Sequence, residues 1–221
     1  MVLKERGPPT HYREIDRWED GVGWLAHPEE RMARASHCLA VDGAVWVVDP
    51  VDAPGIDDLF AEFGDVAGVV VTMDRHGRDA ETVARRHDVP IHLPWFVDRS
   101  FDPPVEPVRG TLGDTDFRLL RVVDLPGWTE GALYDGETLV VGDALGSADY
   151  FVAPGERVGV HPMLRFFPPA ALRGLAPERI LVGHGVGVTE DATAALSHAL
   201  SHARPNAPRV WLKGLRAMIP W

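Results

Sequence analysis

The chain has 221 residues, of which 45% are hydrophobic and 25% charged, and its formal net charge is −11. This is ordinary globular usage with enough apolar residues for a large core, so disorder over most of the length is excluded. The acidic balance argues against sequence-independent nucleic-acid binding, which needs a basic surface. The single cysteine, Cys38, excludes an intrachain disulfide and a cysteine-based zinc site.

No run of about 18 apolar residues is present, and residues 1–20 lack the apolar segment of a secretory signal. We therefore expect a cytoplasmic protein with no membrane partner and no nucleic-acid partner. The expected partner is a small-molecule substrate or ligand, and a homodimer remains an open alternative.

Two similar patterns predict β-hairpins, because an Asp-Gly pair between apolar runs is a strong signal for a two-residue turn. The pairs are Asp42-Gly43, between 38–41 and 44–48, and Asp135-Gly136, between 131–134 and 137–141. Each second strand then leads to an aspartate, Asp49 in the first half and Asp143 in the second.

Helical and strand patterns alternate over the rest of the chain. Helices are predicted at 56–63, 79–87 and 190–202, and strands at 67–71, 89–93, 108–112, 117–123 and 179–182. Prolines predict loops over 94–107 and 149–169. This alternation favours two packed sheets with helices outside.

We expect a single domain over 1–221, with a peripheral arm at 1–20 and a peripheral tail at 205–221. The tail holds an apolar cluster around Trp211, which we expect to pack on its own domain or across a dimer.

Polar segments follow three of the predicted strands, where loops gather functional groups. These segments are 72–79, 125–131 and 183–185. The last is Gly-His-Gly, so its histidine, His184, has glycine on both sides and can face a cavity.

The order of these segments resembles the metallo-β-lactamase-fold hydrolases, especially the glyoxalase II-like branch, from about Cys38 to Ala203. That family has a strand ending in Asp, then T-H-x-H-x-D-H, L-P-G-H-T-x-G, a hairpin ending in G-D, and G-H-G. The matching residues here are Val47-Val48-Asp49, Leu125-Pro126-Gly127 with Thr129 and Gly131, Gly142-Asp143, and Gly183-His184-Gly185. The resemblance implies a four-layer αββα sandwich of two mixed sheets with helices outside, and a metal-dependent hydrolase.

The metal-binding motif departs from the family pattern. With His76 set on the second histidine of T-H-x-H-x-D-H, Asp74 takes the place of the first and Asp79 that of the third. Arg78 then stands where the family has aspartate, and Trp128 replaces the histidine of L-P-G-H.

One interpretation is a site for a single divalent ion, either zinc or manganese or iron, since carboxylates and imidazoles suit all three. Its expected ligands are His76, Asp143, His184, Asp74 and Asp79, with Asp74 and His184 as the candidate catalytic proton carriers. The protein would then be a hydrolase of a small ester or thioester, with its substrate side formed by the loops 94–107 and 149–169.

The other interpretation is a metal-free site in a non-catalytic descendant that acts as a binding or scaffold protein. Clustered carboxylates then need a positive charge; Arg78 can bridge Asp143 and Asp79, and Arg75 can serve too. An arginine among the ligands also repels an incoming metal. In either case we expect Asp49 to hold its own turn and His161 to be an ordinary loop histidine.

Overall fold

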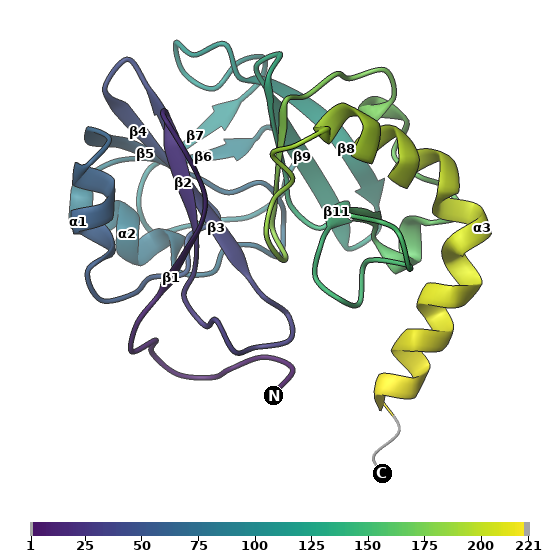
Figure 1. Cartoon of the computed structure of the whole chain (residues 1–221). Coiled ribbons are helices and arrows are strands. Elements are labelled where there is room, and N and C mark those ends of the chain that lie inside the picture. Colours follow the sequence, from purple (N-terminus) through teal and green to yellow (C-terminus); the bar gives the residue numbers. More distant parts are fainter. Residues whose placement is uncertain (1, 219–221) are drawn as a thin grey trace.

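Two β-sheets face each other in the computed structural model, which describes residues 2–218, and helices cover their outer faces (Figure 1). The larger sheet has the order β1 (Arg13–Trp18), β2 (Gly21–Leu25), β3 (Ala35–Val41), β4 (Ala44–Val48), β5 (Asp65–Val70), β6 (Ile91–Pro94) and β7 (Val105–Val108). The smaller sheet has the order β13 (Arg179–Val182), β10 (Thr138–Val141), β9 (Trp128–Tyr134) and β8 (Arg118–Leu125).

Both sheets are mixed. Strands β1 to β4 pair antiparallel and β4 to β7 pair parallel, while β10 is parallel to β13 and antiparallel to β9. The remaining elements are α1 (Ile56–Ala61), α2 (Ala80–His87), α3 (Ala192–Met218), a small ribbon of β11 (Leu145–Gly146) and β12 (Gly159–Val160), and the 3₁₀ turns η1 (Pro162–Leu164) and η2 (Ala170–Leu172).

Three apolar layers hold these elements together. Because side chains alternate along a strand, Val47 of β4 packs toward the helices α1 and α2, and the next residue, Val48, packs between the two sheets. On the far side, Val182 of β13 packs against Leu196 of α3. The predicted αββα sandwich is confirmed.

Both predicted hairpins form, and the first has the expected turn geometry. Asp42 and Gly43 have φ values of 51° and 79°, the positive angles that a type I′ turn requires at both central positions. The turn pairs Val41 with Ala44 and so sets the register of β3 and β4.

Three segments differ from the sequence-based expectation. Residues 105–108, expected as loop, form the edge strand β7, where Pro107 is tolerated because an edge strand need not donate every N–H. The N-terminal arm contains the opposite edge strand, β1, and the buried strand β2 directly follows it. The helix predicted to end at 202 continues as α3 through two prolines to Met218, because one of its faces stays buried at Ala207 and Val210.

Among residues 2–218, no helix combines the length and the apolar character that a membrane span needs.

A candidate metal centre

The candidate site lies where the C-terminal ends of strands from both sheets meet. Parallel pairing of β10 and β13 aligns Val141 with Val182, so that Asp143 and His184 leave the sheet side by side. In the larger sheet, β4 and β5 are also parallel, so the turn at Asp49 lies next to the loop that carries His76. The fold thus brings together residues from four separate segments.

Three side chains converge in a geometry that fits one metal ion. The Nε2 atoms of His76 and His184 each lie 3.0 Å from Oδ1 of Asp143, and the three ligand atoms are all within 4.8 Å of one another. Ligands at 2.0–2.2 Å from a tetrahedral zinc ion stand roughly 3.3 Å apart, close to this spacing. Both rings are buried, and the Asp143 side chain is 15% exposed.

The ring of His184 is oriented so that a lone pair faces a carboxylate. Its Nδ1 is 2.8 Å from the carbonyl oxygen of Met32, and because a carbonyl only accepts, Nδ1 must carry the proton. Burial lowers the pKa of His184, with Asp143 opposing the shift, so the ring is neutral at neutral pH. Its Nε2 lone pair therefore points at Oδ1 of Asp143, which is buried without a hydrogen bond within residues 2–218. This contact is repulsive unless a cation lies between the atoms.

The ring of His76 is held by Asp49. Oδ2 of Asp49 is 2.8 Å from Nδ1 of His76, and Asp49 itself accepts hydrogen bonds from the backbone N–H and the hydroxyl of Thr72, at 2.8 and 2.6 Å. A carboxylate that fixes the outer nitrogen of a metal-binding imidazole is a common supporting interaction of metal sites. Asp49 thus does more than hold its turn.

The charges in the site are strongly coupled. Burial alone would raise the pKa of Asp143, but the His76 ring, whose Nε2 lies 3.0 Å from Oδ1, holds that pKa well below its usual range. Burial and Arg78 act to lower the pKa of His76, yet Asp49 and Asp143 outweigh them and raise it. The shift favours the protonated form of His76, whereas the ring of His184 still directs a lone pair at Asp143. We conclude that the three residues suit a divalent cation.

The other two predicted ligands, Asp74 and Asp79, are not part of this group. Oδ2 of Asp74 accepts a hydrogen bond from the backbone N–H of Thr129 at 3.0 Å, at the start of β9. Oδ2 of Asp79 accepts from the N–H of Asp52 at 2.9 Å and lines a cavity of about 730 Å³ beside residues 4–9.

Arg78 does not bridge Asp143 and Asp79. Its guanidinium instead donates to three backbone carbonyls, those of Ala35, Asp49 at 2.8 Å and Gly183 at 3.0 Å. It also lies 3.4 Å from Nε2 of His76. Burial lowers the pKa of Arg78. The side chain therefore braces the ends of β4 and β13 and the start of β3 from inside.

Arg75 is the arginine that pairs with Asp143. Its Nη2 lies 3.2 Å from Oδ2 of Asp143, and its guanidinium stacks over Trp128 at 4.5 Å from the ring centroid. The Arg75 side chain is 45% exposed. Oδ2 of Asp143 is thus paired with a cation, whereas Oδ1 faces the histidines.

Trp128 forms a hydrogen bond with the buried carboxylate of Glu130, which was not among the predicted site residues. Its indole N–H donates to Oε2 of Glu130 at 3.0 Å, and Oε1 accepts from the N–H of Ala144 at 2.9 Å. Burial, reinforced by Asp143, raises the pKa of Glu130 to about 7. Glu130 occupies an unspecified position of the L-P-G-H-T-x-G pattern, so no sequence signal marked it.

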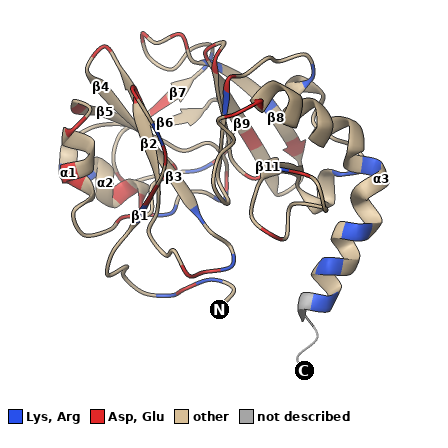
Figure 2. Cartoon of the chain, in the orientation of Figure 1, with Lys and Arg blue, Asp and Glu red and all other residues tan. Residues whose placement is uncertain are grey.

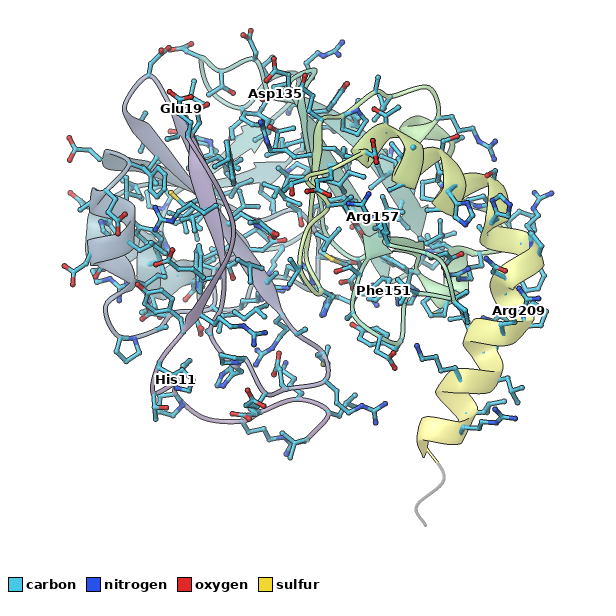
Figure 3. The ribbon with its side chains drawn as sticks, viewed as in Figure 1. His11, Glu19, Asp135, Phe151, Arg157 and Arg209 are labelled. Atoms are coloured by element: carbon cyan, nitrogen blue, oxygen red, sulfur yellow. The ribbon has the colours of Figure 1, made fainter. Side chains whose placement is uncertain are left out.

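The long segment after Asp143 covers one side of the site. Phe151, labelled in Figure 3, stacks on His184 with ring centroids 5.8 Å apart, and His161 packs edge-on between Phe151 and Trp128. Nδ1 of His161 accepts from the N–H of Met163, and burial lowers the pKa of the ring to about 4. From the other predicted loop, Arg99 donates to the carbonyl of Asp74 at 2.6 Å.

Comparison with solved structures finds many similar chains, although no protein-family model and no curated protein matches the sequence. The metallo-beta-lactamase DIM-1, exposed to ceftazidime, has a TM-score of 0.59 and 13% identity, covering 90% of this chain and 99% of its own. ETHE1 from Myxococcus xanthus has a TM-score of 0.54 and 13% identity, covering 96% and 92%. A variant of the flavo di-iron protein from Thermotoga maritima has a TM-score of 0.62 and 16% identity, covering 88% and 63%.

Proposed function

Because the chain has the metallo-β-lactamase fold, we propose that it binds one divalent metal ion and hydrolyses a small ester or thioester. The observation that supports this proposal is the neutral ring of His184, whose lone pair faces a buried carboxylate oxygen 3.0 Å away. Two histidines and one carboxylate are a donor set for zinc and also for iron(II) or manganese. When bound, the ion lowers the pKa of a coordinated water to about 7, which supplies a nucleophile at neutral pH.

The same residues argue for one ion rather than two. On one side of the three ligands, the Arg78 guanidinium places a fixed positive charge 3.4 Å from His76. On another side, Trp128 stands where the resemblance predicts a histidine, and its indole N–H is a donor that cannot ligate a metal. Three protein ligands leave coordination positions for water and substrate, as in catalytic zinc sites.

The surrounding residues would orient the reacting groups. Asp49 and the carbonyl of Met32 keep both imidazole Nε2 atoms directed at Asp143. Arg75 holds the other carboxylate oxygen of Asp143, so the ligand oxygen keeps its place. The neutral ring of His161 carries its proton on Nε2, since Nδ1 is an acceptor. The ring packs against Phe151, which in turn stacks on His184, and we assign its N–H as the donor to the substrate carbonyl oxygen, on which negative charge develops during attack.

A specific observation favours a second candidate, a metal-free binding or scaffold protein. Arg75 and Arg78 already place two positive charges against Asp143 and His76, at 3.2 and 3.4 Å. A protonated His76 would lie between the carboxylates of Asp49 and Asp143 and satisfy both. In this state the cost of burying the carboxylates is offset without a metal.

Metal content separates the two candidates. Protein stripped with a chelator is dialysed against zinc, iron(II) or manganese, and the bound metal is measured by elemental analysis. We expect about one ion per chain in the parent and none in an Asp143→Ala, His184→Ala double variant. A matched double variant outside the site, Asp79→Ala with His198→Ala, should bind as the parent does.

Loaded protein is then tested on a panel of small aryl esters and thioesters. Hydrolysis that disappears in the Asp143→Ala, His184→Ala variant and persists in the matched control supports the hydrolase. If the parent takes up no metal under any of these conditions, the single-metal proposal is wrong and the metal-free candidate replaces it.

A further inference from the structure

An exposed apolar surface lies where the C-terminal part of α3 meets the segment after η1. We call it the apolar patch, and its six side chains have exposed fractions between 44% and 80%. They are Met163, Phe166, Phe167, Trp211, Leu212 and Leu215. They make up half of the exposed large hydrophobic side chains among residues 2–216, whose exposure the structure describes. Exposed apolar residues gathered in this way mark an interaction surface rather than ordinary surface composition.

The patch is held in place by contacts between its two segments. The rings of Phe166 and Trp211 meet edge-on with centroids 5.5 Å apart. The indole N–H of Trp211 donates to the carbonyl of Pro162 at 2.9 Å, and Nε of Arg204 donates to the carbonyl of Phe166 at 2.7 Å. The apolar side chains are therefore presented on an ordered support.

The helix that carries half of the patch is basic, in contrast to the rest of the chain. All 33 acidic residues lie outside α3, which contains four arginine and lysine residues and no acidic one. Figure 2 shows these cations as blue bands on the part of α3 that extends away from the sheets. They are Arg204, Arg209, Lys213 and Arg216.

Helical spacing places the cations beside the apolar residues. At about 100° per residue, Trp211, Leu212 and Leu215 share one stripe of the helix, and Arg209 and Arg216 lie on the stripe next to it. The buried residues Ala207 and Val210 face the domain instead. Figure 1 shows the end of α3 projecting beyond the sheets, and the residues of both stripes are exposed.

We propose that the apolar patch docks on an anionic lipid bilayer surface. A helix with tryptophan and leucine on one face and arginine and lysine beside them is the arrangement that binds in the interfacial region of a bilayer. The acidic remainder of the protein would be repelled by such a surface, so contact is confined to the patch. This departs from our sequence-based expectation of no membrane partner, which rested on the lack of a spanning or secretory segment.

Charge argues against a second copy as the occupant. A symmetric dimer pairs each patch with itself. The interface would then bring together the cations Arg209 and Arg216 of both copies, with no acidic residue of α3 to compensate them. An anionic bilayer instead offers opposite charge together with an apolar layer.

Co-sedimentation of the full chain with lipid vesicles tests the proposal. We expect binding to vesicles in which about a third of the lipid is phosphatidylglycerol, and little binding to pure phosphatidylcholine. Binding should fall sharply when the salt concentration is raised to about 0.5 M, because salt screens exposed charges. Each removed cation should lower the partition coefficient about five-fold, so Arg209→Gln with Arg216→Gln should lower it by more than tenfold.

A matched pair of variants distinguishes binding through the apolar patch from nonspecific adsorption of the protein to vesicles. Trp211→Ser with Leu215→Ser should abolish binding. Trp95→Ser with Arg109→Gln, an exposed tryptophan and arginine that contact each other after β6 and β7, should leave it unchanged. Circular dichroism checks that each variant is folded. Absence of binding to anionic vesicles, or equal loss in the control pair, would overturn the proposal. It would also be overturned if the parent is a dimer that the patch variants convert to a monomer.

Discussion

Replacement of Arg78 by methionine should lower stability and at the same time tighten metal binding. The guanidinium of Arg78 bonds the carbonyls of Ala35, Asp49 and Gly183, and methionine fills a similar volume without any donor. Three carbonyl oxygens at the ends of strands then lose a charged partner.

The expected loss follows from these contacts. A hydrogen bond to a charged donor contributes about 1.5–3 kcal/mol, and because Arg78 is only partly buried, water offsets part of the loss of its three bonds. We expect the metal-free variant to lose about 3–5 kcal/mol of unfolding free energy. For a chain of this size that lowers the Tm by about 10 °C or more.

Metal affinity should change in the opposite direction. The guanidinium lies 3.4 Å from Nε2 of His76. A unit charge about 5 Å from a divalent ion costs several kcal/mol at an effective dielectric constant of about 20. Even if most of this is screened, zinc should bind at least about ten times more tightly to Arg78→Met than to the parent.

Urea unfolding in the presence of a chelator measures the stability. Zinc titration in competition with a chromophoric chelator measures the zinc affinity. Arg78→Lys should keep the repulsion and therefore the weak zinc binding, while losing part of the stability. Arg75→Met, at a side chain that is 45% exposed, should lose less than about 1 kcal/mol. The reasoning is refuted if Arg78→Met is as stable as the parent in chelator, or if its zinc affinity is unchanged.

Three further predictions concern other polar groups. Asp49→Asn should weaken metal binding about 10–100-fold without changing the number of ions at saturation, because His76 loses its charged hydrogen-bond partner. Isothermal titration measures the affinity and the number of ions bound. An unchanged affinity would contradict the role of Asp49. Burial raises the pKa of Asp16 to about 6, so its folded form holds the proton more tightly than the unfolded form, and its contribution to stability is lost as pH rises from about 4 through 6. Asp16→Asn should therefore be about 1–3 kcal/mol more stable than the parent in urea at pH 7.5 and equal to it at pH 4, and a destabilised variant at pH 7.5 would show this assignment to be wrong. Glu156→Gln leaves the fully buried Arg165 without its charged partner, so the free energy of unfolding should fall by about 3–5 kcal/mol in the same assay. A loss below about 1 kcal/mol would mean that the pair is not a buried ionic contact.

Local sequence determined the framework of this protein. The Asp42-Gly43 and Asp135-Gly136 pairs mark both hairpins, because Gly43 and Gly136 adopt positive φ angles, 79° and 112°, that few other residues tolerate. Apolar runs mark the strands, and the Gly-Asp and Gly-His-Gly segments mark the ends at which polar residues gather. These signals depend only on neighbouring residues, so they could be read without the fold.

Tertiary structure decided which of the candidate ligands meet. Among the five predicted ligands, only His76, Asp143 and His184 converge, since Asp74 and Asp79 are taken up by backbone N–H groups. The sequence could not have shown this choice, because the position of a carboxylate depends on which donor the surrounding loops offer.

The orientation of His184 depends on a residue remote in the chain. Its Nδ1 donates to the carbonyl of Met32, 152 residues away. The Arg78 guanidinium likewise bonds carbonyls from three different strand ends. Backbone carbonyls carry no residue identity, so these contacts leave no trace in the sequence. They nevertheless decide where the lone pairs point and how much positive charge the site already holds.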